Sequence, residues 1–147
     1  MNLSICIITK NEEQNIDRCL KALAPYGLET IVVDTGSTDR TKQIAARYTD
    51  RLYDFPWCDD FSAAKNFAIE KASHSYVLVL DSDEFVEQLD LSALEKQIAA
   101  HPGAVGRIRR RNVFHRNGEE QENRERINRI FAKEYFPFMS GITFPNS

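Results

Sequence analysis

An apolar run ends in carboxylates at Tyr76-Val77-Leu78-Val79-Leu80-Asp81-Ser82-Asp83-Glu84. A run of this kind is typical of a buried strand, which would deliver the carboxylates to the rim of a sheet. Open parallel α/β sheets bind ligands beyond the carboxyl ends of their strands. Divalent hard cations bind carboxylate oxygens together with ligand phosphates. We therefore predict a metal and phosphate site at Asp81 and Asp83.

A second strand with the same design comes earlier in the chain. Ile31-Val32-Val33 runs directly into Asp34. The structural alternative for each acid is strong, because Asp is a good helix cap and turn residue. For Asp34 that alternative is a turn-closing or capping role. Two apolar strands that both end on an acid favour a binding site.

Asp-x-Asp also suits other chemistries. In a phosphatase Asp81 would be the nucleophile and Asp83 the acid. That class expects the motif at the first strand, with Thr or Val two residues after the second Asp. Here Phe85 holds that position, and the first strand ends in Thr9-Lys10-Asn11-Glu12. A nucleotidyltransferase is less favoured still, since no glycine-rich phosphate loop follows the first strand.

The composition bounds the class of protein. The chain has 147 residues, which suits one domain, and a formal net charge of -3. This charge and a pI near 5.6 argue against nucleic acid or anionic membranes as partners. No stretch is long enough to span a bilayer, and the start of the chain lacks signal-peptide features. The three cysteines form neither a disulfide framework nor a metal motif, so we expect a cytoplasmic protein.

Strand and helix patterns alternate over the first two thirds, which is typical of βαβ units and a parallel sheet. Ser37 or Thr38 is expected to cap the helix after Asp34, with Asp39 in its first turn. The predicted strands are Leu3 to Ile8, Thr30 to Val33, Arg51 to Phe55 and Tyr76 to Leu80. The predicted inward helical residues are Ile16, Cys19, Leu20, Leu23, Ile44, Ala45, Tyr48, Phe61, Ala64, Phe67, Ala68, Leu91, Leu94 and Ile98.

The last third predicts a β-hairpin. Asn117-Gly118 is a strong turn signal between a strand from Ala104 to Phe114 and a return through Ile127 to Phe131. Three arginines share one face of the outgoing strand. We interpret this face as a solvated edge paired with glutamates of the return. The alternative places it near an anionic acceptor or the substrate diphosphate, because arginine forks grip phosphate oxygens well. The arginines are Arg107, Arg109 and Arg111, and the glutamates are Glu119, Glu120, Glu122 and Glu125.

Four motifs follow one another along the chain. They are Ser4-Ile5-Cys6-Ile7-Ile8-Thr9-Lys10-Asn11-Glu12-Glu13, Val32-Val33-Asp34-Thr35-Gly36-Ser37-Thr38-Asp39-Arg40-Thr41, Asp60-Phe61-Ser62-Ala63-Ala64-Lys65-Asn66 and Leu78-Val79-Leu80-Asp81-Ser82-Asp83-Glu84. In this order they resemble the signatures of the family 2 glycosyltransferases. The resemblance covers about residues 3 to 87 and reaches more weakly to Arg129-Ile130-Phe131.

This resemblance implies a GT-A fold, which is an α/β fold whose mostly parallel sheet is flanked by helices. It also implies a Rossmann-like nucleotide-binding half and a metal-binding Asp-x-Asp. The implied reaction is an inverting, metal-dependent transfer of a sugar from a nucleotide-diphosphate sugar to an unknown acceptor. A UDP-sugar is the favoured donor.

The family pattern also assigns residues to the nucleoside. It places Thr9 and Glu12 near the nucleoside and gives Asp34 a hydrogen bond from the uracil or another base. A hydrogen bond to a charged group contributes roughly 1.5 to 3 kcal/mol. For Glu12 the alternative is a first-turn glutamate that the helix dipole favours anyway.

The phosphate side follows from the same resemblance. Asp83 would coordinate Mn2+ or Mg2+ between the two phosphates, and Asp81 would contact the ribose or the metal shell through water. The metal would act as a Lewis acid and neutralise the departing diphosphate. Lys65 stands where the family often has Arg and would contact a phosphate without the bidentate fork. A solvated lysine is the alternative for Lys65.

One departure from the family pattern concerns the end of the sequence. In the close subgroup a Gly-Ile-x-His-Glu segment follows the Arg-Ile-Phe strand, whereas residues 138–147 contain neither His nor Glu. We expect a single, C-terminally truncated domain, with the nucleotide-binding part in residues 1–103 and the start of the acceptor part in residues 104–147. No general base can be nominated. Glu84 and Glu87 are close to the metal motif, but they also suit a surface helix.

A non-catalytic chain that binds a nucleotide or a partner protein is the alternative function. Its supporting feature is Tyr135-Phe136-Pro137-Phe138, which would be awkward if left exposed, so self-association through this segment is part of that hypothesis. Because an acceptor platform and a base have no counterpart in the sequence, we expect the chain to bind the donor but to transfer sugar to an acceptor poorly or not at all.

Overall fold

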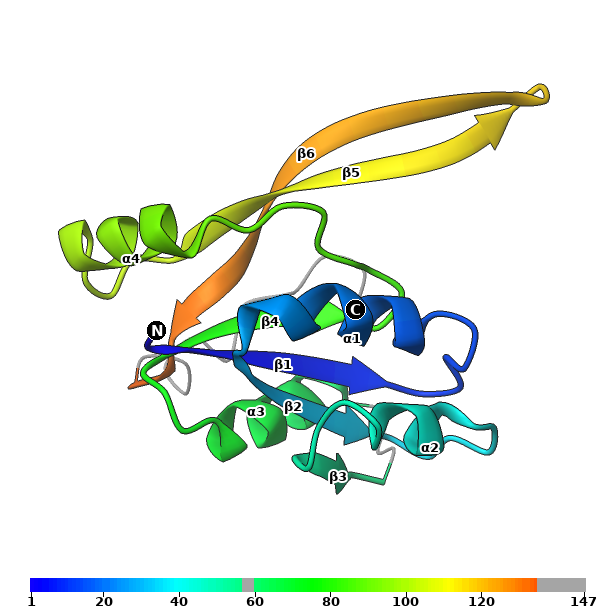
Figure 1. Cartoon of the computed structure of the whole chain (residues 1–147), viewed down its shortest axis with the longest axis horizontal. Coiled ribbons are helices and arrows are strands. Elements are labelled where there is room, and N and C mark those ends of the chain that lie inside the picture. The colour runs from blue at the N-terminus through cyan, green and yellow to red at the C-terminus, as the bar shows by residue number, and fades with distance from the viewer. Residues whose placement is uncertain (57–59, 135–147) are drawn as a thin grey trace.

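Strands and helices alternate in the computed structural model, which describes residues 1–56 and 60–134 (Figure 1). The strands are β1 (Leu3–Thr9), β2 (Glu29–Asp34), β3 (Leu52–Asp54), β4 (Tyr76–Asp81), β5 (Gly106–Arg116) and β6 (Glu119–Ala132). The helices are α1 (Ile16–Leu23), α2 (Thr41–Ala45), α3 (Phe61–Lys71) and α4 (Leu91–Ala100), with a short 3-10 helix η1 (Ala24–Tyr26) after α1. The four strands predicted for the first two thirds are confirmed, and β6 begins well before the predicted Ile127.

The six strands form one sheet in the order β3-β2-β1-β4-β6-β5. The first four strands of this order are parallel, whereas β6 runs antiparallel to β4 and β5 antiparallel to β6. Leu78 pairs with Ile130, so residues of β6 before Ile130 lie toward and beyond the carboxyl end of β4. The hairpin therefore projects past the edge of the sheet where the parallel strands end (Figure 1).

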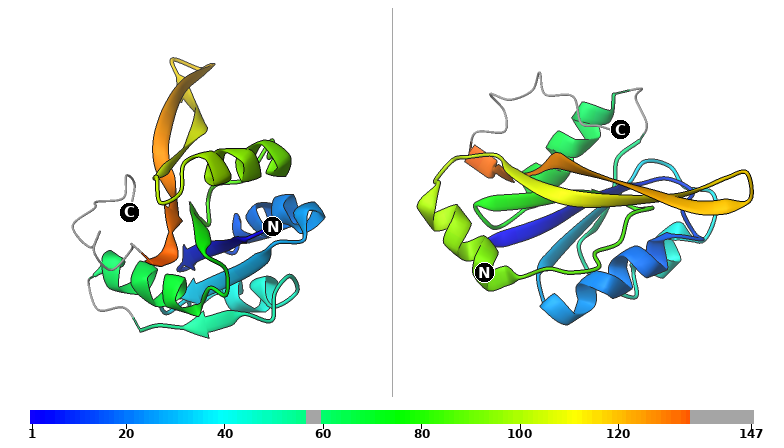
Figure 2. Two further views of the ribbon diagram at one scale, coloured as in Figure 1. Left: turned by 90° about the vertical axis from the view of Figure 1, so that its left-hand side faces the viewer. Right: turned by 90° about the horizontal axis from the view of Figure 1, so that it is seen from above.

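The sheet is covered on both faces because successive side chains of a strand point to opposite sides. Leu3, Ile5 and Ile7 of β1 pack into a core with α1 and α2, while Cys6 and Ile8 pack into a second core with α3. Figure 2 shows α1 and α3 on opposite sides of the strands. The parallel strands are therefore buried on both faces, as their unbroken apolar runs predict.

The start of α2 differs from the prediction. Neither Ser37 nor Thr38 caps it, because the helix begins at Thr41 and its N-cap residue, Arg40, makes no side-chain cap. Both predicted caps are tied to the loop after β1 instead. Asn11 N donates to Ser37 Oγ at 2.8 Å, and Thr38 N donates to Asn11 Oδ1 at 2.8 Å. Asp39 lies before the helix and accepts from Thr41 N at 3.0 Å, so the loop takes over the capping role.

Two helices bury less than the sequence predicts. Phe61 was expected to face the core but is 40% exposed, because the buried side of α3 is formed by Ala64, Lys65, Ala68 and Ile69. In α4 no residue is fully buried, and Leu94 only partly packs against the core. Lys65 is thus buried on α3, at a kind of position where an apolar side chain is usually found.

The hairpin confirms its predicted turn and corrects its predicted pairing. Asn117 and Gly118 have φ values of 55° and 77°, the left-handed conformation that this turn requires. β5 is the edge strand, and the ion pair of Arg111 with Glu122 agrees with the predicted pairing. Directly opposite, however, Arg109 faces Arg126 and Arg111 faces Arg124. From Arg107 to Arg116 the register follows from the two-residue turn, and it shifts between Gly106 and Arg107. Within the described residues no helix is long or apolar enough to cross a membrane.

Candidate functional site

Three predicted site residues meet at the carboxyl edge of the parallel strands. Thr9 at the end of β1 lies in register with Asp34 at the end of β2, and Asp81 at the end of β4 lies in register with Ile8. Thr9 and Asp34 are buried, and Asp81 is half-buried. The structure therefore brings together acids that are far apart in the sequence, at the edge where such sheets bind ligands.

Asp34 closes the turn that follows β2. Its Oδ1 accepts hydrogen bonds from Gly36 N at 2.9 Å and Ser37 N at 2.8 Å, and its Oδ2 accepts from Ser37 Oγ at 2.5 Å. Gly36 has a φ of 121°, which favours glycine over any other residue. The turn-closing interpretation is thus confirmed. An ionised carboxylate oxygen can accept more than one hydrogen bond, so Oδ2 keeps capacity for a ligand donor.

The loop after β1 frames the other side of this turn. Glu12 N donates to Thr41 Oγ1 at 2.8 Å, and the Glu12 carboxylate accepts from Asn15 Nδ2 at 2.8 Å. Glu12 therefore connects its loop to the first residue of α2 and to Asn15, the residue before α1. Thr9 Oγ1 is buried and makes no hydrogen bond to the described residues. A buried hydroxyl without a partner is costly, and here it lies at the strand end beside Asp34.

Asp83 lies in a tight turn beyond β4. Asp81 N donates to Glu84 Oε1 at 2.9 Å, and Glu84 N donates to Asp81 O at 3.0 Å, which closes the turn on both sides. Asp83 itself is exposed and makes no hydrogen bond or ion pair within residues 1–56 and 60–134. Burial raises the pKa of the nearby Cys19 thiol to about 12, and Glu84, Asp83 and Asp81 act in the same direction. The Cys19 thiol of α1 lies 4.0 Å from the backbone carbonyl of Asp81, so α1 borders this turn.

These carboxylates suit a divalent cation only in part. Among the described residues no three His, Cys, Asp or Glu side chains form a group that could hold a metal ion. Mg2+, and Mn2+ with similar oxygen ligands, is commonly held by one or two carboxylates together with substrate phosphates and water. The exposed Asp83 carboxylate close to Asp81 fits that arrangement, in which the ligand would complete the coordination shell.

Arg129 is a site residue that the sequence analysis did not assign. It lies on β6 with no exposed surface, and its guanidinium donates to Val79 O at 3.3 Å. The same group donates to Asp81 Oδ2 at 3.4 Å and to Glu84 Oε2 at 3.3 Å. A single arginine within the apolar end of a strand was the available signal, because a buried charge needs a partner. That partner could not be identified without the β4–β6 pairing.

Lys65 is buried close to the same acids, so the alternative of a solvated lysine is wrong. Only 1% of the residue is exposed. Burial lowers the pKa of Lys65 to about 8, and the negative charge of Asp81 partly offsets this effect. Burial also raises the pKa of Asp81, against the opposing influence of Arg129. Two cationic side chains, Lys65 and Arg129, thus flank Asp81 at the edge of the sheet.

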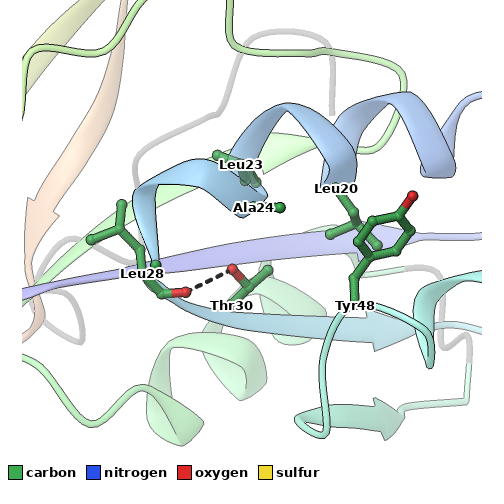
Figure 3. Close-up of a pocket in the computed structure, with 7 residues that line it drawn as sticks. Leu20, Leu23, Ala24, Leu28, Thr30 and Tyr48 are labelled. Carbon is green, nitrogen blue, oxygen red and sulfur yellow. Dashed lines mark hydrogen bonds between the residues drawn. The ribbon is translucent and has the colours of Figure 1, made fainter.

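A small cavity lies away from this edge. Its volume is about 270 Å³, and it is enclosed by α1, η1, the start of β2 and the aromatic ring of Tyr48 (Figure 3). The residues that line it are Leu20, Leu23, Ala24, Gly27, Leu28, Thr30 and Tyr48. None of the acids described above contributes to it, so we assign the candidate site to the open carboxyl edge and not to this cavity.

Comparison with known proteins agrees with the fold. The model of Glycosyl transferase family 2 matches residues 4–145, and the chain belongs to this family. It is 34% identical over 133 residues to the lipopolysaccharide core biosynthesis glycosyltransferase LpsC of Rhizobium meliloti. The aligned region covers 86% of this chain and 48% of LpsC.

Solved structures share the GT-A fold. S. aureus TarS 1-349 in complex with UDP-GlcNAc has a TM-score of 0.61 and 29% identity, over 71% of this chain and 33% of that chain. Glucosyl-3-phosphoglycerate synthase from Mycobacterium tuberculosis, in complex with Mg2+ and UDP, has a TM-score of 0.51 and 26% identity, over 56% of this chain and 34% of that chain. The chain thus spans about half of LpsC and about a third of these solved proteins. The aromatic segment 135–138 and the end of the sequence lie outside the described residues.

Proposed function

We propose that this domain binds a nucleotide-diphosphate sugar, with a UDP-sugar favoured, at the carboxyl edge of β1, β2 and β4. The protein to which the domain belongs transfers the sugar to an acceptor with inversion. The observation that carries this proposal is the exposed Asp83 carboxylate, which has no hydrogen bond or ion pair among the described residues and lies in a closed turn beside Asp81. The UDP-GlcNAc complex of TarS and the Mg2+ and UDP complex of glucosyl-3-phosphoglycerate synthase support the choice of ligand.

Each residue then has a defined task. Asp34 accepts a hydrogen bond from the base at Oδ2, and the hydroxyl of Thr9 with the loop of Glu12 borders the nucleoside. Asp81 contacts the ribose or the metal shell. Asp83 holds Mn2+ or Mg2+, which when bound neutralises the departing diphosphate. The ammonium group of Lys65 adds positive charge on the phosphate side as a point charge without a bidentate fork.

Family membership also decides between the chemistries that Asp-x-Asp allows. A phosphatase would use Asp81 as a nucleophile. Asp81 instead lies at the end of β4, an interior strand, and its carboxylate accepts a hydrogen bond from the buried Arg129. The match to Glycosyl transferase family 2 supports a glycosyltransferase instead. We therefore retain no phosphatase function.

The isosteric change Asp83→Asn tests the proposal. UDP affinity should fall about tenfold or more in Mn2+, because the amide loses the charge that binds the metal, and should stay unchanged in EDTA. Isothermal titration calorimetry under both conditions measures this split. Asp50→Asn is the matched control, since Asp50 is also exposed and makes no hydrogen bond or ion pair within the described residues. An equal loss of UDP affinity with Mn2+ and with EDTA would mean that Asp83 is only a turn residue and does not bind metal.

A further inference from the structure

Glu84 uses both carboxylate oxygens inside the protein. Its Oε1 accepts from Asp81 N at 2.9 Å. Its Oε2 lies 3.3 Å from the guanidinium of Arg129 and 3.5 Å from that of Arg110. The side chain is only 18% exposed. Glu84 therefore ties its own turn to two arginines of the hairpin strands.

Arg129 completes this connection from the other side. Its guanidinium bonds the carbonyl of Val79 in β4, the carboxylate of Asp81 and the carboxylate of Glu84. Burying an arginine is costly unless carboxylates compensate the charge. The guanidinium, the two carboxylates and the closed turn thus hold one another in a single arrangement, and Asp83 lies within that turn.

We propose that Glu84 and Arg129 are positioning residues, which fix the turn Asp81–Glu84 so that Asp83 faces the metal and diphosphate. Glu84 is then not the base that removes the acceptor proton. A general base must reach the acceptor hydroxyl within hydrogen-bond distance. Both Glu84 oxygens instead point at a backbone N–H and at guanidinium groups of the protein. This inference rests on the proposed function, which supplies the ligand for Asp83.

The two roles for Glu84 lead to different binding behaviour. A general base contributes to the chemical step, so its replacement would leave UDP affinity unchanged. A positioning residue sets the metal ligand, so its replacement weakens UDP binding only when metal is present. We expect Glu84→Ala to lower UDP affinity in Mn2+ about tenfold and to leave affinity in EDTA unchanged. Glu84→Gln, which keeps an acceptor for Asp81 N, should lose less.

Arg129 is tested by a conservative and a severe change. Arg129→Met removes the charge and should lower UDP affinity in Mn2+ at least as much as Glu84→Ala. Arg129→Lys keeps a cation and should recover part of the loss. Glu87→Gln is the matched control. Glu87 follows the same turn, but it is exposed and forms an ion pair with Arg111 of the hairpin. It should bind UDP like the unchanged protein.

A second measurement needs no ligand and separates this inference from the proposed function. The hydrogen bond from Asp81 N to Glu84 should protect that amide from hydrogen exchange, and Glu84→Ala should raise its exchange rate about tenfold.

Circular dichroism identifies variants that fail to fold, and Glu84→Gln and Arg129→Lys then serve in their place. Slow exchange in folded Glu84→Ala, or normal metal-dependent UDP binding by folded Glu84→Gln and Arg129→Lys, would overturn the inference. If the unchanged protein binds no UDP with metal, the proposed function fails while the exchange result still decides the role of Glu84.

Discussion

At the scale of single residues, Lys65 is an ionisable side chain that is buried at this edge. It lies on the inner side of α3 between small alanines, and its ammonium group is 5.7 Å from the centre of the Phe61 ring. Because burial favours the neutral amine, the pKa of Lys65 falls to about 8. A bound diphosphate favours the charged form. The protonation state of Lys65 should therefore change with pH in the range where proteins are commonly assayed.

UDP affinity in Mg2+ should fall as the pH rises from 7 to 9.5. Below pH 8 Lys65 is mostly charged and attracts phosphate, whereas above pH 8 this attraction is lost. A hydrogen bond between charged groups contributes roughly 1.5–3 kcal/mol, so the loss should be about tenfold or more. Calorimetry at several pH values measures it. In Lys65→Arg the charge persists at every pH tested, and parallel profiles for the two proteins would exclude this role.

The residues at the site differ in how far the sequence predicts them. Asp34, Asp81 and Asp83 each follow an apolar strand, so their place at the carboxyl edge follows from local sequence alone. Arg129 could not be assigned in this way, because its partners lie about fifty residues earlier and meet it only through the β4–β6 pairing. Helical spacing predicts that Phe61 is on the buried side of α3, whereas Lys65 is buried there instead.

At the scale of elements, the hairpin combines a predictable turn with an unexpected distribution of charge. Alternation predicts the arginine face of β5, but the cross-strand partners depend on the exact register of β6. Like charges directly opposite one another destabilise a strand pair. Arg109 and Arg126 form such a pair, and neither makes an ion pair with another described residue. Elsewhere on the ribbon Arg110 bonds Glu125, and Arg111 bonds Glu122 and Glu87.

Arg126→Glu should stabilise the hairpin by replacing repulsion with attraction. Opposite-charge cross-strand pairs contribute about 0.2–1 kcal/mol, and the gain should shrink at high salt. Hydrogen exchange of the backbone amides of β5, measured at low and at high ionic strength, reports this local change. Arg126→Gln is the control, because it removes the repulsion without adding an attraction and should show a smaller gain. An unchanged exchange rate in Arg126→Glu at low salt would contradict the register of this pair.

At the scale of the whole molecule, the order of the strands creates the site. β1 lies at the centre of the parallel strands with β2 and β4 on either side, so Thr9, Asp34 and Asp81 meet although they are distant in the chain. The alternation of strands and helices predicts this parallel arrangement. It does not predict that β6 joins the sheet antiparallel beside β4, which brings Arg129 to the site. A ligand bound at this edge contacts the ends of three core strands at once.

A nucleoside diphosphate with metal should therefore stabilise the whole fold, because the unfolded chain lacks the assembled edge. A ligand at a hundred times its dissociation constant contributes about 2.7 kcal/mol, which raises the Tm of a domain of this size by about 5–10 °C. We expect this shift for UDP with Mn2+, a smaller one for UDP in EDTA, and none for inorganic phosphate. Thermal melts of one preparation under these conditions, with GDP as a further arm, rank the ligands. A shift with phosphomonoesters alone would oppose nucleotide-sugar binding, and equal shifts for UDP with Mn2+ and in EDTA would oppose a metal bound at Asp83.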